Sequence, residues 1–135
     1  MTTATHAAMH RDHRQWTSEL KSWGEDLEQW MSELKSAHTL AEIGLQKHLA
    51  LLESHIEAVR QAKQQIAAYE HAVADNEQSG QAETTVLDAS LQEAHRRQAA
   101  ETESIRDAHH QLRRHHHTII THLAALNRAL DIHLE

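Results

Sequence analysis

The sequence predicts an all-α protein, an antiparallel bundle of three long helices with coiled-coil-like packing. The chain of 135 residues contains no Pro and only 3 Gly, so nearly all helix-breaking residues are missing. Apolar residues recur at alternating steps of four and three, the spacing of helices that pack along a narrow seam. A polar segment at 75–81 interrupts this spacing. The length suits one domain, so we take residues 1–135 as a single bundle.

A first helix is expected over residues 5–36. Its heptad positions carry three Trp at intervals of seven, and Leu residues share their face, as a packed core requires. The spacing therefore predicts that these rings fill a core seam. The series is Met9, His13, Trp16, Leu20, Trp23, Leu27, Trp30 and Leu34.

A second helix is expected over residues 40–77. Thr39 and Glu42 have the spacing of a capping box, which predicts a helix start. No Gly or Pro enforces a turn there, so one continuous helix through 36–40 remains open. The seam of this helix is Ala41, Leu45, His48, Leu52, His55, Val59, Ala62, Ile66, Tyr69 and Val73.

A third helix is expected over residues 84–133, after the break that contains Gly80, with Thr84 or Thr85 as its cap. This helix would be longer than the other two, which leaves three alternatives. We expect it to bend, to break near 108–118 and so give a four-helix bundle, or to pair with another chain. Its apolar line is Leu91, Ile105, Leu112, Ile119 and Leu126, widened by Leu123 and Leu130.

Composition excludes several functional classes. The chain has no Cys, which rules out disulfides and thiolate chemistry. A net charge of −7 argues against nucleic acid or an anionic membrane as partner, despite four Arg at 96, 97, 113 and 114. No segment is long and apolar enough for a membrane span or a secretory signal, so a cytoplasmic location is expected. No nucleophile elbow, phosphate loop or dinucleotide fingerprint is present, which argues against an enzyme.

The chain has 15 His, and several occupy seam positions. An inward imidazole without a partner costs about 1–3 kcal/mol, so it must find a hydrogen bond or a metal ion. A turn centred near residue 81 brings together positions whose numbers add up to about 162. His48 and His55 then lie level with the region of His109, His115 and His116. A helix-surface role is expected for the others, His38, His95, His110, His117 and His133.

Carboxylates complete two candidate metal sites. A turn near residue 38 would place Glu28 level with His48 and Glu25 near His55. Imidazoles with a carboxylate suit a transition metal such as Zn, Fe, Cu, Ni or Mn. The first candidate site is His48, His55, His109 and His116, with Glu28.

The second candidate site lies at the other end of the predicted bundle. His6, His10 and His13 share one helix face, and the same turn would set them beside Glu70 and His71. A frayed, solvated N-terminal turn is the alternative interpretation of these histidines.

Three spaced pairs of metal-competent residues lie along the chain: His6–His10, His38–Glu42 and His71–Asp75. With them the chain resembles the hemerythrin-like proteins, four-helix bundles that hold metal with His and carboxylates. The resemblance implies a non-haem iron site with oxygen binding or di-iron chemistry.

Two functions follow as hypotheses. The first is a metal-binding bundle for storage, sensing or a non-haem iron site, with Fe, Zn, Cu or Ni as the ion. The second is a coiled-coil interaction or assembly module without catalysis, in which a homodimer buries the stripe of Leu123, Leu126 and Leu130. In that case the inward histidines mark the register or act as a pH switch.

Overall fold

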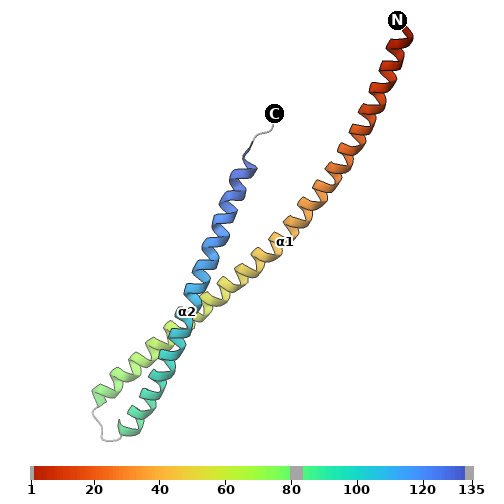
Figure 1. The fold of residues 1–135 in the computed structure, drawn as a ribbon. Coiled ribbons are helices and arrows are strands. Elements are labelled where there is room, and N and C mark those ends of the chain that lie inside the picture. Colours follow the sequence, from red (N-terminus) through yellow and green to blue (C-terminus); the bar gives the residue numbers. More distant parts are fainter. Residues whose placement is uncertain (1, 80–83, 133–135) are drawn as a thin grey trace. The chain divides into compact units, whose positions relative to one another are not determined.

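The computed structural model describes residues 2–79 and 84–132, and the side-chain surroundings of residues 5–78 and 88–132. Two helices make up this part of the chain: α1 spans Thr2–Ser79 (78 residues) and α2 spans Thr84–Leu130 (47 residues) (Figure 1). The all-α class is confirmed. The expected count of three or four helices is wrong, because α1 replaces the two helices expected over 5–36 and 40–77.

The expected turn at 36–40 is absent, and Thr39 shows why. Its hydroxyl Oγ1 donates to the carbonyl oxygen of Lys35, one turn earlier, at 3.0 Å. This bond is made inside a continuing helix, so the side chain does not cap a new one. With no Gly or Pro between residues 36 and 40, the helix has no local reason to stop. α2 likewise runs unbroken through 108–118. The break predicted at 75–81 begins too early, because α1 continues to Ser79. Residues 80 and 81 of that segment lie outside the described residues.

The chain divides into two units, residues 1–46 and residues 47–135, which are described separately. The second unit is a helical hairpin, in which residues 47–79 of α1 lie antiparallel beside α2 (Figure 1). Side-chain contacts that cross it include His48 with His116, His55 with His109, and Asn76 with Asp88 at 2.5 Å. The residue numbers of each pair add up to 164, so the register differs by two residues from the one expected.

The seam of the hairpin is narrow and partly polar. Its four buried residues are Ala62, Ala94, His48 and Gln98, exposed by 6–8%. Small side chains let the helices approach closely, but they bury little apolar surface. Predicted seam positions are half-buried on both helices: Leu52, Val59 and Tyr69 on α1, and Leu91, Ile105, Leu112 and Ile119 on α2.

The first unit, residues 1–46, consists of α1 alone. Its heptad face is exposed: Trp16 and Trp23 by 53%, Trp30 by 59% and Leu34 by 70%. The prediction that the Trp rings fill a core within the chain is wrong. The segment expected to fold back over them is instead the continuation of the same helix. We call this face the exposed stripe; it consists of Met9, His13, Trp16, Leu20, Trp23, Leu27, Trp30 and Leu34.

Candidate functional site

Two histidine pairs bridge the helices of the hairpin. His48 Nε2 lies 3.1 Å from His116 Nδ1, and His55 Nε2 lies 3.0 Å from His109 Nδ1. The rings in both pairs are stacked, with interplanar angles of 18° and 27°. Within each helix the two histidines are seven residues apart, so the pairs form consecutive layers of the seam. We call His48–His116 the buried pair and His55–His109 the outer pair.

The buried pair is enclosed and incompletely hydrogen-bonded. His48 is only 6% exposed, and its Nδ1 atom has no hydrogen-bond partner among the described residues. The ring of His115 meets His48 edge-on, with 5.2 Å between ring centroids. Burial, followed by the nearby charges of His115 and His116, lowers the pKa of His48 below its ordinary value. Burial therefore favours the neutral form of the His48 ring, in which one ring nitrogen keeps a lone pair.

The outer pair has a different electrostatic setting. Arg113 Nη2 lies 3.3 Å from His109 Nε2. A guanidinium can only donate, so His109 Nε2 must be the acceptor and carry no hydrogen. In the neutral ring the hydrogen then sits on Nδ1, where it is donated to His55 Nε2. Arg113 thus fixes the tautomer of His109 and places a positive charge beside the pair.

The turn that was to bring a carboxylate to the first site is absent from α1. Glu28 precedes His48 on the same continuous helix, in the other unit of the chain. The expectation that Glu28 lies level with His48 therefore loses its basis. No group of three or more His, Asp or Glu in residues 2–79 and 84–132 is arranged to hold a metal ion.

The second candidate site loses its basis for the same reason. The missing turn was to set residues 6–13 beside residues 70 and 71, but all of them lie on α1. The rings of His13 and Trp16 are tilted by 53° to one another, with their centroids 5.5 Å apart. His71 Nε2 lies 3.4 Å from Asp75 Oδ2, and both side chains are well exposed. His10 and His13 line a shallow surface depression with Arg14 and Thr17.

Sequence reasoning missed the role of Arg113 in the histidine layers and the contact that His115 makes with His48. Arg113 follows His109 by four residues, a spacing that places two side chains on one helix face. His115 was expected near this level, but its edge-on approach to His48 depends on the exact register. It also lines, with His55, an open groove of about 410 Å³ beside the hairpin seam, whose other lining residues are Leu51, Ser54, Ala58, Ala108, Gln111 and Leu112.

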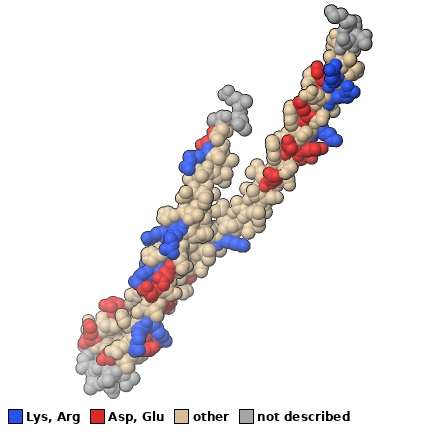
Figure 2. Space-filling model, viewed as in Figure 1, with Lys and Arg blue, Asp and Glu red and all other residues tan. Residues whose placement is uncertain are grey.

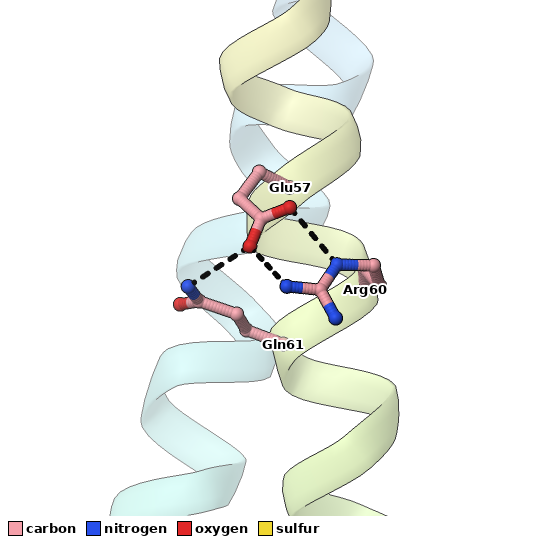
Figure 3. Close-up of polar contacts among 3 residues, drawn as sticks. All are labelled: Glu57, Arg60 and Gln61. Carbon is pink, nitrogen blue, oxygen red and sulfur yellow. Dashed lines mark hydrogen bonds and ion pairs between the residues drawn. The ribbon is translucent and has the colours of Figure 1, made fainter.

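An ion pair on α1 lies away from the histidine layers (Figure 3). Arg60 donates from Nε to Glu57 Oε2 at 2.9 Å and from Nη2 to Oε1, and Gln61 donates to Oε1 at 3.2 Å. These hydrogen bonds favour the ionised carboxylate, so Arg60 above all lowers the pKa of Glu57. Both side chains are half exposed, and the pair belongs to a solvated helix surface.

Neither described helix has a segment apolar and long enough to cross a membrane. Comparison with protein-family models, with curated proteins and with solved structures finds no match to this chain.

Proposed function

We propose that this protein is a self-assembling coiled-coil module, and that the partner of its exposed stripe is a second copy of the chain. The observation that carries this proposal is the apolar heptad face of residues 9–34, which no described residue covers. Soluble monomers rarely leave large contiguous apolar surface in water. Here the three Trp side chains of the chain all lie on that stripe, exposed by 53–59%, while the buried apolar residues among the described part of the hairpin are two alanines.

The stripe is suited to packing against itself. All its layers except His13 carry Trp, Leu or Met, so two identical copies meet with apolar side chains at nearly every level. The heptad positions of the stripe also continue, along the sequence of α1, into the heptad positions of the hairpin seam. Two successive steps of four, from Trp30 to Leu34 and on to His38, join the two heptad phases. In the sequence, the stripe and the seam of the hairpin therefore form one uninterrupted series of heptad positions.

Charges beside the stripe favour a parallel orientation. The residues that directly precede His13, Leu20, Leu27 and Leu34 are all acidic: Asp12, Glu19, Asp26 and Glu33. The residues that directly follow Met9, Trp16, Trp23 and Trp30 include no carboxylate, Lys or Arg: they are His10, Thr17, Gly24 and Met31. Antiparallel copies would bring two acidic flanks together, whereas parallel copies set each acidic flank against a flank without carboxylate, Lys or Arg. In Figure 2, residues other than Lys, Arg, Asp and Glu, drawn in tan, cover most of the visible surface.

The mass of the full, untagged chain in solution tests this proposal. Sedimentation equilibrium at micromolar concentration should give a multiple of 15.4 kDa. Replacing the three rings together (Trp16→Gln, Trp23→Gln and Trp30→Gln) should give the monomer. A matched control changes three residues on the opposite helix face at the same spacing (Ser18→Gln, Glu25→Gln and Ser32→Gln) and should keep the wild-type mass. A wild-type chain that sediments as a monomer throughout would refute self-assembly.

A further inference from the structure

The buried pair lacks the usual explanation for a histidine in a helical core. A structural core histidine satisfies both ring nitrogens by hydrogen bonds. His48 is more than nine-tenths buried, yet its Nδ1 atom has no partner among the described residues and its Nε2 atom faces another imidazole. A buried ring that is only half satisfied destabilises the hairpin as it stands. The nitrogen that marks the site for a ligand is the other one, Nε2, which faces the imidazole nitrogen Nδ1 of His116 at 3.1 Å.

We propose that His48 Nε2 and His116 Nδ1 together bind one divalent first-row transition metal ion, of the Zn, Ni or Cu class. Neutral imidazoles are the preferred nitrogen ligands of these ions. Two nitrogens on one tetrahedral ion lie about 3.4 Å apart, given metal–nitrogen distances of about 2.0–2.1 Å. The observed separation of 3.1 Å needs to widen by only a few tenths of an ångström. Water completes the coordination, because the described residues offer no third ligand in place.

The hydrogen between the two rings does not prevent binding. In the neutral contact one nitrogen carries the hydrogen that the other accepts. When the ion enters, that hydrogen transfers, through solvent, to the other nitrogen of the same ring. Each ring then presents a lone pair to the ion and stays neutral, so no net proton leaves.

The outer pair has nearly the same geometry but is a poor cation site. Ligation through His109 Nδ1 requires its hydrogen to move to Nε2, and Arg113 already donates to Nε2. The guanidinium would then face an N–H group, and its positive charge repels the incoming ion. The two layers therefore form a matched pair, in which one is free to bind a cation and the other is blocked.

Calorimetric titration of the full, untagged chain with NiCl2 or ZnCl2 tests the assignment, about one pH unit above the ordinary histidine pKa. We expect one ion per chain, and His48→Gln or His116→Gln should each weaken binding roughly tenfold or more. The matched controls His55→Gln and His109→Gln should bind almost as the wild type does. Absence of binding, binding that survives both ligand variants, or equal loss in the controls would overturn the proposal.

A second measurement on the wild-type chain covers the case in which a ligand variant fails to fold. Substoichiometric Ni²⁺ is paramagnetic, so it should broaden the imidazole NMR signals of His48 and His116 before those of His55 and His109. Broadening that begins at His110 or His117 would assign the ion to the helix surface and reject the site. The triple Trp→Gln variant should still bind the ion, so this proposal and self-assembly can fail separately.

Discussion

Two stretches of α1 carry the same heptad repeat but very different side chains. The seam from His48 onward is covered by α2, and its buried members are two alanines, a glutamine and a histidine. The exposed stripe of residues 9–34 carries the Trp and Leu side chains, and no described residue covers it. Burying a large apolar side chain contributes about 1.5–3 kcal/mol, far more than burying an alanine. The greater driving force for packing therefore lies on the uncovered stretch.

This difference suggests that the hairpin seam mainly determines which positions pair, whereas the exposed stripe mainly contributes packing energy. In the hairpin, polar layers pair only with their own level, because each imidazole of a pair needs the other ring at hydrogen-bonding distance. Polar core residues of this kind fix register at a cost in stability. The exposed stripe contains one polar layer, His13, so it gains more energy from packing but specifies its partner less sharply.

The largest expected effect concerns the orientation of the assembled stripes. The chain has no native Cys, so a single introduced thiol reports on one contact. In a parallel assembly each Met9 lies beside its counterpart, and Met9→Cys should form a disulfide-linked dimer of about twice 15.4 kDa in most molecules under mild oxidation. Ser18→Cys, on the opposite face, is the control and should stay largely uncrosslinked on a non-reducing gel. Equal crosslinking of both variants, or of neither, would contradict a parallel stripe.

The same comparison shows which features are readable from the sequence. The missing Pro and the heptad spacing predict the all-α class, and the seam from His48 to Tyr69 follows from periodicity. Counting back from the break near residue 81 places His48 and His55 within two residues of the levels of His116 and His109, which they contact. These predictions succeed because helix pitch and hairpin geometry convert spacing directly into position.

The missing turn at 36–40 could not be predicted from local signals. Thr39 and Glu42 match a capping box, but a threonine hydroxyl can equally bond back to the carbonyl of the preceding turn, as it does to Lys35. The choice depends on whether another segment covers the Trp face, which the local sequence does not encode. Two further expectations depended on this turn and lose their basis because it is absent. One placed Glu28 beside His48, and the other placed Glu70 and His71 beside the N-terminal histidines.

A smaller effect is expected from making the covered seam more like the exposed stripe. Gln98 is 7% exposed; its Nε2 atom donates to Thr102 Oγ1 at 3.4 Å, and its Oε1 atom has no partner among the described residues. Gln98→Met keeps the length of the side chain and removes the unsatisfied oxygen, so it should raise the free energy of unfolding by about 1–2 kcal/mol. Urea denaturation measures this.

Two further variants decide whether polarity limits the covered seam. Gln98→Ala also removes the buried oxygen but leaves a void, so it should stabilise the hairpin less than Gln98→Met does. A control in the uncovered unit, Gln29→Met, lies on the helix surface and should change the urea midpoint little. If Gln98→Met destabilises the chain, Gln98 is satisfied in solution, and the contrast between a polar seam and an apolar stripe loses its energetic meaning.

The smallest expected effect comes from an ion pair that stabilises helix α1 itself and takes no part in the pairing of helices. Glu57 and Arg60 form an exposed pair within α1, and the hydrogen bonds from Arg60 lower the pKa of Glu57 (Figure 3). A carboxylate whose pKa falls on folding stabilises the folded state above its ordinary pKa of 4.5, and this contribution is lost as the pH drops through the depressed value. Glu57→Gln should therefore lower the melting temperature slightly at neutral pH and leave it unchanged in strong acid. Because the pair touches neither histidine layer nor the exposed stripe, sedimentation and ion titration of this variant should match the wild type. Melting curves that differ from the wild type only in acid would show that the pair does not act through the ionised carboxylate.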